Sequence, residues 1–125
     1  MSKLVISSSN APAAIGPYSQ AIKTGSMVFT SGQIGLDPVS GELVAGFEAQ
    51  VRRAFTNLTA VANQAGGSLS DVVKFTLFLT DLSQFSVVNE IMKEFVPEPY
   101  PARSTVGVLS LPKGAEFEVE AILVF

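Results

Sequence analysis

The spacing of apolar residues changes several times along this chain of 125 residues, and each change predicts a structural element. Residues 19–23 and 27–31 flank Thr24-Gly25-Ser26, a sequence typical of a tight turn, so they predict a β-hairpin. Asp37-Pro38-Val39-Ser40-Gly41 predicts a second turn. Apolar residues then recur every three or four positions, which predicts an amphipathic helix that ends at Gly66-Gly67. These positions are Val51, Ala54, Phe55, Leu58, Val61, Ala62 and Ala65.

The next segment returns to a spacing of two and predicts a strand over residues 72–79. The residues expected on its apolar face are Val73, Phe75, Leu77 and Leu79, opposite to Lys74 and Thr76. A second helix is predicted to begin at Asp81 or Ser83 and to end before Pro97, because the residue before a proline disfavours helical geometry.

Two more strands are predicted at residues 103–108 and 117–125, joined by a loop that contains Pro112-Lys113-Gly114. The order over residues 1–125 is therefore β-β-β-α-β-α-β-β. We interpret it as one α+β domain, a six-stranded mixed sheet with both helices on one face. Two helices cannot cover both faces of such a sheet, so the other face is expected to pack against another subunit.

The composition supports this expectation of an oligomer. The chain is 47% apolar and only 15% charged, whereas about a quarter of an average globular chain is charged. The net charge of −3 and the absence of a run of basic residues argue against a nucleic-acid partner. No apolar run approaches the ~20 residues that a membrane span needs, and the start of the chain does not resemble a secretion signal. The chain contains no cysteine, which fits a cytoplasmic location.

Candidate chemistry centres on Arg103, a cation within an otherwise apolar stretch. A guanidinium in such surroundings needs an anionic partner, either a protein carboxylate such as Glu120 or the carboxylate or phosphate of a ligand. The chain has neither histidine nor cysteine. This composition leaves no Ser-His or Cys-His nucleophile pair and no histidine or cysteine metal site. We therefore expect no metal and no organic cofactor, and chemistry that uses the remaining polar side chains and water.

Glu120 is the second candidate, because it shares one face of its predicted strand with the apolar Ile122. On the preceding strand Arg103, Thr105 and Gly107 share one face. If the two strands formed an antiparallel hairpin, Glu120 would lie near the level of Arg103. A cation and a carboxylate in one pocket could then hold an anionic substrate and orient a water molecule.

Five segments of the chain together resemble the signature of the RidA (YjgF/YER057c/UK114) family. They are Ala14-Ile-Gly-Pro-Tyr-Ser-Gln-Ala21, Phe29-Thr-Ser-Gly-Gln-Ile34, Pro101-Ala-Arg-Ser-Thr-Val106, Leu111-Pro-Lys-Gly-Ala115 and Glu118-Val-Glu-Ala-Ile122. The resemblance covers almost the whole chain and implies a chorismate mutase-like α+β fold. It also implies a homotrimer with ligand clefts between subunits. The implied activity is hydrolysis of reactive enamines and imines, such as 2-aminoacrylate, to 2-oxo acids and ammonia.

The resemblance also assigns roles to individual residues. Arg103 would bind the substrate carboxylate, and Glu120 would orient or deprotonate the attacking water. Thr105 stands where relatives often carry cysteine, and its hydroxyl could still donate a hydrogen bond to the ligand. The other residues carried over as substrate contacts are Tyr18, Ser31, Gly32 and Asn89.

Other functions remain open at this point. The same cleft could bind 2-oxo acids without catalysis and act as a sensor, since that role also needs Arg103. RNA cleavage or inhibition of translation, ascribed to some family members, fits less well, because the chain is acidic and has no histidine for acid–base work.

Overall fold

The computed structural model describes residues 2–125, which contain seven strands, two α-helices and three short 3-10 helices. The strands are β1 (Leu4–Ile6), β2 (Ala21–Thr24), β3 (Met27–Thr30), β4 (Gln33–Ile34), β5 (Val72–Leu79), β6 (Ala102–Gly107) and β7 (Phe117–Val124). The helices are α1 (Phe47–Gln64) and α2 (Phe85–Phe95), and the 3-10 helices are η1 (Leu69–Asp71), η2 (Leu82–Gln84) and η3 (Pro112–Gly114).

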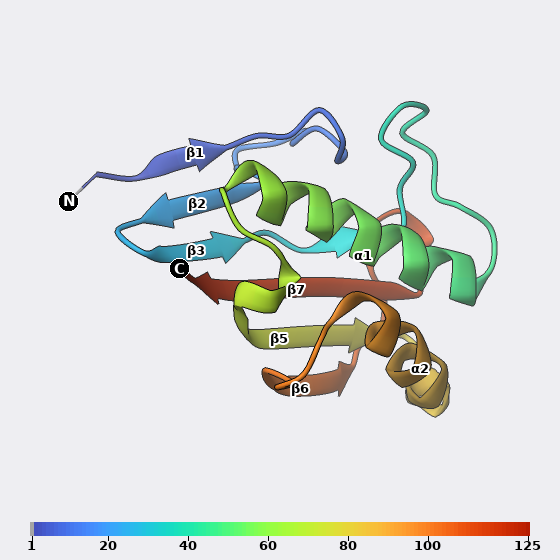
Figure 1. Ribbon diagram of the computed structural model, residues 1–125. Helices are drawn as coiled ribbons and strands as arrows, with labels where there is room; N and C mark the ends of the chain where they lie inside the picture. The colour runs from blue at the N-terminus through green and yellow to red at the C-terminus, as the bar shows by residue number, and fades with distance from the viewer. Residues whose placement is uncertain (1) are drawn as a thin grey trace.

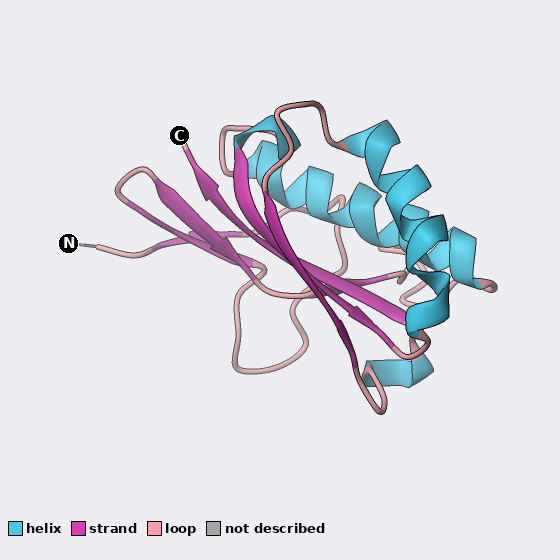
Figure 2. Cartoon of the chain, turned by 90° about the horizontal axis from the view of Figure 1, so that it is seen from below, coloured by secondary structure: helices cyan, strands magenta, loops and turns pink. Residues whose placement is uncertain are grey.

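The strands form one mixed sheet in the order β1-β2-β3-β7-β5-β6, and β4 also pairs with β7 (Figure 1). All neighbouring strands are antiparallel except β5 and β6. Both α-helices lie on the same face of the sheet (Figure 2). The predicted α+β class and the placement of both helices are confirmed, although the sheet has one strand more than the six predicted.

The local signals explain where the elements begin and end. Gly25 has a φ of 59° in the turn between β2 and β3, a conformation that glycine adopts without the strain of a side chain. Gly66 has a φ of 101° after α1, and the N–H of Gly67 donates to the carbonyl of Ala62. The 3-10 turn before α2 begins at Asp81, whose side chain accepts a hydrogen bond from the N–H of Ser83.

The core lies between the sheet and the helices, and Phe55 of α1 is at its centre. The Phe55 ring packs edge-on against Phe75 of β5, with ring centroids 6.0 Å apart, and lies tilted against Phe117 of β7 at 5.7 Å. It also stacks on Phe95 of α2 at 5.5 Å. This aromatic cluster therefore joins the two helices to two neighbouring strands of the sheet.

The predicted hairpin of the last two strands is wrong. β7 pairs antiparallel with β5 on one side, and β6 pairs parallel with β5 on the other. The parallel arrangement of β5 and β6 is possible because α2 forms the crossover between them. After η3 the chain enters the middle of the sheet as β7, between β3 and β5. Every second residue of β7 is buried there.

The predicted apolar face of β5 is wrong at one position. The register between β5 and β7 shifts between Val72 and Lys74, so that Val73 is an extra residue in a β-bulge. Val72 is consequently buried, whereas Val73 is 46% exposed. Strict alternation beginning at Val73 could not reveal a bulge, because a single extra residue exchanges the two faces of a strand.

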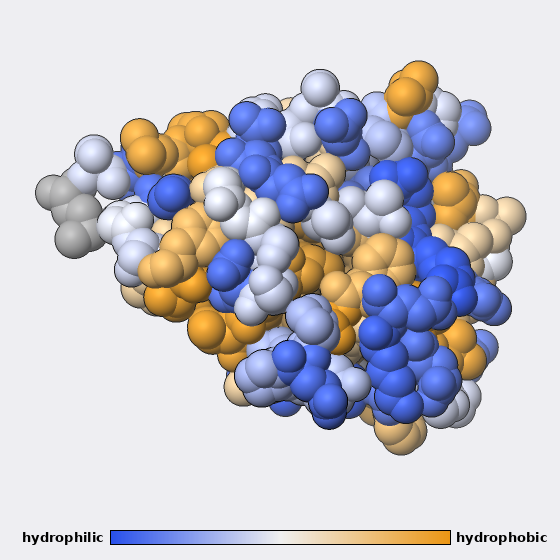
Figure 3. All heavy atoms as spheres, in the orientation of Figure 1, coloured by the Kyte–Doolittle hydropathy of each residue, from blue (hydrophilic) through white to orange (hydrophobic). Residues whose placement is uncertain are grey.

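The face of the sheet opposite the helices carries exposed apolar side chains. The strand register places Val5, Met27, Phe29, Val106 and Val124 on this open face. Figure 3 shows the helix side for contrast, where polar side chains cover much of the outer surface of the helices and apolar ones gather near β1 and β2. Apolar surface of this kind on an open sheet face is typical of an interface.

We expect Phe55→Ala to lower the free energy of unfolding by about 3–5 kcal/mol, because the substitution leaves a cavity among three aromatic rings. Urea titration followed by circular dichroism measures this change. Val39→Ala is the matched control, since Val39 is 95% exposed and its truncation removes almost no packing. Equal midpoints for the two variants would contradict the central position of Phe55.

Candidate functional site

A break in the sheet between β3 and β4 forms one side of a large cavity. β3 pairs with β7 through Phe29 and Ile122, and β4 resumes the pairing through Gln33 and Val119, with one more residue on the β3–β4 side. Within the break, the Thr30 hydroxyl accepts a hydrogen bond of 2.9 Å from the N–H of Ala121. Residues 31 and 32 therefore leave the ladder and line a hollow beside β7.

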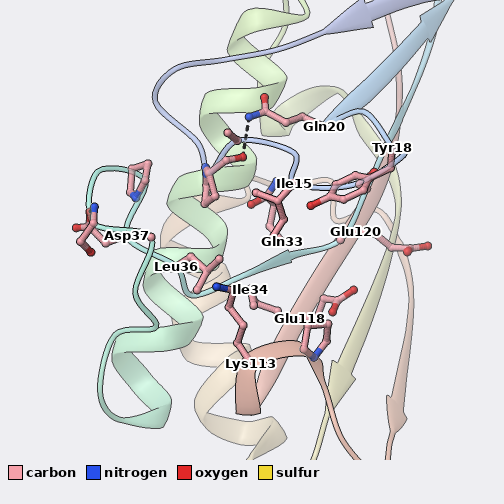
Figure 4. Close-up of a pocket in the computed structure, with 18 of the residues that line it drawn as sticks. Ile15, Tyr18, Gln20, Gln33, Ile34, Leu36, Asp37, Lys113, Glu118 and Glu120 are labelled. Carbon is pink, nitrogen blue, oxygen red and sulfur yellow. Dashed lines mark hydrogen bonds between the residues drawn. The ribbon is translucent and has the colours of Figure 1, made fainter.

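This cavity, which we call the carboxylate pocket, has a volume of about 780 Å³ (Figure 4). Its walls come from residues 12–20, the break between β3 and β4, the turn at residues 36–41, the η3 loop and β7. Glu118 and Glu120 both line it from the open face of β7. In Figure 4, Glu120 lies nearer to Tyr18 and Glu118 nearer to Lys113.

The surroundings of Glu118 change the ionisation of its carboxyl. Its partial burial raises the pKa of its carboxyl above the ordinary value, and the charge of Glu120 raises it further. The side chain lies directly against the backbone of Gly32, where a Cβ atom would overlap the Glu118 carboxyl. Glycine is therefore required at position 32 for Glu118 to occupy this place.

The loop that carries Tyr18 is held by two polar side chains. Gln20 is buried, accepts a hydrogen bond of 2.7 Å from the N–H of Ser8, and donates to the carbonyls of Ser8 and Pro12. Ser31 donates its hydroxyl proton to the carbonyl of Ser19 at 2.6 Å. Tyr18, half exposed, is thus presented at the edge of the pocket by an anchored loop.

A second, smaller cavity of about 400 Å³, the arginine pocket, lies between α2 and the start of β6. Arg103 donates from Nη1 to Oδ1 of Asn89 at 2.6 Å and to the sulfur of Met92 at 3.7 Å. Among residues 2–125, no carboxylate lies within ion-pair distance of Arg103. Within one chain, Arg103 therefore does not form an ion pair with Glu120. The guanidinium keeps N–H donors available for an anionic ligand.

Within one chain, Arg103 and Glu120 do not share a pocket, because the hairpin that would have brought them to one level does not form. Arg103 pairs in register with Phe75, whose side chain is buried on the helix face, while Glu120 pairs with Thr76 on the open face. These two side chains consequently project from opposite faces of the sheet, with β5 between their strands.

The remaining predicted site residues divide between these pockets. Asn89 lines the arginine pocket, and Tyr18, Ser31, Gly32 and Glu120 line the carboxylate pocket. Thr105 contributes to neither pocket, and its buried hydroxyl has no hydrogen-bond partner among the described residues. An unpaired buried hydroxyl is costly, so Thr105 retains a donor that a ligand or a neighbouring chain could satisfy.

Sequence reasoning passed over Glu118, Gln20 and Lys113. Glu118 could have been found, because the spacing of two places it on the same face as Glu120. Gln20 and Lys113 carry no such signal, since their importance depends on loops that are distant in sequence.

The described residues contain no group of three or more histidine, cysteine, aspartate or glutamate side chains that could hold a metal ion. Within the same residues, neither α-helix is long and apolar enough to cross a membrane.

The family model described as endoribonuclease L-PSP matches residues 8–125. The chain belongs to this family. The resemblance to the RidA family that the five segments indicated is thereby confirmed. A curated relative from Dermatophagoides farinae, named 2-iminobutanoate/2-iminopropanoate deaminase, is 47% identical over 123 residues, which cover 98% of this chain and 96% of the relative.

Solved structures of relatives have the same fold over the full chain. RidA from a Psychrobacter species is 52% identical, with a TM-score of 0.95, and the match covers 98% of this chain and 99% of the relative. Escherichia coli TdcF, solved with bound serine, is 45% identical with a TM-score of 0.93, and the match covers 98% of each chain.

We expect Gly32→Ala to lower the free energy of unfolding by at most about 1 kcal/mol, because the new methyl group must displace the flexible Glu118 side chain. The same substitution in a Glu118→Ala background should cost less, since the clash is gone, and a double-mutant cycle of unfolding free energies measures the difference. Gly16→Ala is the control, because a Cβ there would meet neighbouring atoms at an ordinary 3.5 Å. Equal costs in both backgrounds would exclude the contact between Gly32 and Glu118.

Proposed function

We propose that this protein hydrolyses reactive enamines and imines, such as 2-iminobutanoate and 2-iminopropanoate, to 2-oxo acids and ammonia. The observation that carries the proposal is Arg103, held by Asn89 and without a carboxylate partner among the described residues. Such an arginine is suited to bind a substrate carboxylate through paired charge-assisted hydrogen bonds. The names of relatives 45–47% identical over nearly the whole chain support the same activity.

The active site is composite and needs a second copy of the chain. In a 2-imino acid the carboxylate is bonded to the reacting carbon, so the arginine and the proton-transfer carboxylate must lie within a few ångströms of one substrate. Within one protomer these groups lie on opposite faces of the sheet. The apolar open face provides a surface for association, and a homotrimer, as the family resemblance implies, would bring Arg103 of one copy to the carboxylate pocket of the next.

The chemistry then uses protein side chains and water, with no metal or organic cofactor. The enamine tautomerises to the imine, and Arg103 and a backbone amide orient it through its carboxylate. A water oxygen attacks the imine carbon while a glutamate accepts the proton, and the electron pair of the C=N bond moves to nitrogen, which takes up a proton. The resulting carbinolamine loses ammonia as the hydroxyl oxygen forms the new carbonyl. Tyr18 limits the space around the side chain of the substrate.

We assign the proton acceptor to Glu118, where the sequence indicated Glu120. A general base works best when its pKa lies close to the operating pH, and the pKa of Glu118 is raised by burial and by Glu120. Glu118 also lies against Gly32, at the break in the sheet that lines the carboxylate pocket. Glu120 then acts through its charge on Glu118 and through contacts with water in the same pocket.

Replacement of Arg103 by alanine should reduce kcat/KM between about thirty-fold and a few thousand-fold, because an anchor worth about 2–5 kcal/mol is lost. The assay couples a pyridoxal-phosphate-dependent serine or threonine dehydratase to this protein and follows decay of the released enamine. Arg53→Ala is the matched control, since Arg53 also donates to an asparagine, Asn57, but lies outside both pockets. Full activity in the Arg103 variant would exclude the proposed anchor.

The pH dependence distinguishes the two glutamates. A base acts only when deprotonated, so activity should rise with pH through the pKa of Glu118, above the ordinary glutamate value. Glu118→Gln should abolish this rise, whereas Glu120→Gln should shift it to lower pH, because the repelling charge is removed. Comparison of pH–kcat/KM profiles on one substrate cancels the titration of the substrate itself. If activity still rises with pH in Glu118→Gln but not in Glu120→Gln, Glu120 is the base and the assignment to Glu118 is wrong.

A non-catalytic sensor of 2-oxo acids is the second candidate, because it would use the same anchor. The observation that favours it is that Escherichia coli TdcF, a relative with the same fold, was solved with bound serine, a small amino acid that carries a carboxylate. If wild-type protein fails to accelerate enamine decay but binds 2-oxobutyrate in calorimetry, the sensor function replaces the enzymatic one.

The description of the family model names an endoribonuclease, but the chain offers little to support that activity here. It has no histidine and a net charge of −3, so neither the usual acid–base residue nor a basic surface stripe is available.

A further inference from the structure

The carboxylate pocket is much larger than the substrates named so far require. A volume of about 780 Å³ is typical of sites for drug-sized ligands, whereas 2-iminobutanoate is a very small molecule. The space extends from the glutamates to the turn at residues 37–41. Ile15, Ile34 and Leu36 provide apolar walls along it (Figure 4). Within one chain, the pocket therefore has room beyond the two glutamates, along these apolar walls.

Lys113 lies at this extended part of the pocket in an unusual backbone conformation. Its φ of 60° and ψ of 19° place it in the left-handed region, which costs a residue with a Cβ atom roughly 1–2 kcal/mol. In Figure 4 its side chain runs up the pocket wall and its ammonium group lies beside Ile34 and Leu36. Strained residues at a ligand pocket are a recognised sign of function.

The Lys113 ammonium group has no anionic partner among the described residues. No ion pair or hydrogen bond joins it to another side chain. Asp37 lines the same pocket, but its carboxylate accepts hydrogen bonds from the N–H groups of Ser40 and Val39, which lower its pKa. Of the described residues that line this pocket, Lys113 is the one that carries a positive charge. Lys113 is exposed, and from its loop it can reach an anionic group of a ligand that lies along these apolar walls.

We propose that Lys113 binds a second carboxylate of the substrate, so that the protein also acts on 2-imino dicarboxylic acids, the imines of acidic amino acids. This inference rests on the proposed deaminase function. The carboxylate beside the imine would bind Arg103 of the neighbouring copy, and the apolar walls would contact the methylene groups of the side chain. The terminal carboxylate would then reach the Lys113 ammonium group.

The test compares two imines on each variant. A flavin-dependent amino-acid oxidase acting on aspartate or glutamate supplies the dicarboxylic imine, and the dehydratase described above supplies the monocarboxylic one. Imine that remains after a fixed time is trapped with semicarbazide and quantified. Lys113→Asn removes the charge while keeping a residue that tolerates the left-handed conformation, and Lys113→Arg keeps the charge.

We expect Lys113→Asn to reduce kcat/KM for the dicarboxylic imine on the order of ten-fold or more beyond any reduction for the monocarboxylic one. Lys113→Arg should restore most of the difference. Lys3→Asn, a charge-matched substitution at an exposed position outside both pockets, should affect neither substrate. Equal reductions for both imines in Lys113→Asn, or none, would overturn the inference.

Calorimetry separates this inference from the deaminase proposal. The products 2-oxoglutarate and 2-oxobutyrate are titrated into wild type and Lys113→Asn, which requires no catalysis. A loss of affinity specific to 2-oxoglutarate in the variant supports the Lys113 subsite even if neither imine is hydrolysed. Unchanged affinity for 2-oxoglutarate in the variant contradicts the subsite, even if the monocarboxylic imine is hydrolysed normally.

Discussion

The alternation of side chains along β7 is the constraint on which both the core and the site depend. One face of this strand contributes Phe117, Val119, Ala121 and Leu123 to the buried core. The other face presents Glu118 and Glu120 to the carboxylate pocket. Because β7 lies between β3 and β5 in the middle of the sheet, packing of its apolar face fixes the positions of both glutamates. The packing of the core and the positions of the two glutamates are thus set by one register.

The neighbouring elements adapt to this strand. β3 and β4 leave the ladder at Ser31 and Gly32, which gives the Glu118 side chain room against a glycine backbone. Ser31 directs its proton to Ser19, and Gln20 anchors the preceding segment, so the Tyr18 loop is held by the same break in the sheet. The wall of the pocket formed by this loop is therefore held in place by hydrogen bonds of buried or partly buried polar side chains.

Within one chain, Arg103 lies apart from the two glutamates of the carboxylate pocket. β5 separates β6 from β7, and Arg103 projects towards α2 while the glutamates project from the open face. A cation and a carboxylate that are kept apart in this way do not neutralise each other, and each remains available to a ligand. The proposed homotrimer would cover exposed apolar residues such as Phe29, and the same interface would bring Arg103 to the carboxylate pocket of the next copy.

The sequence by itself determined the elements whose signals are local. The turn at Gly25, the helix that ends at Gly66, the α+β class and the family all followed from the spacing of apolar residues or from short motifs. Only the tertiary structure decided that β6 and β7 flank β5, that Val73 forms a bulge, and that Arg103 and Glu120 face opposite ways. Strand pairing and bulges depend on contacts between residues far apart in the chain, and no local pattern encodes which strands become neighbours.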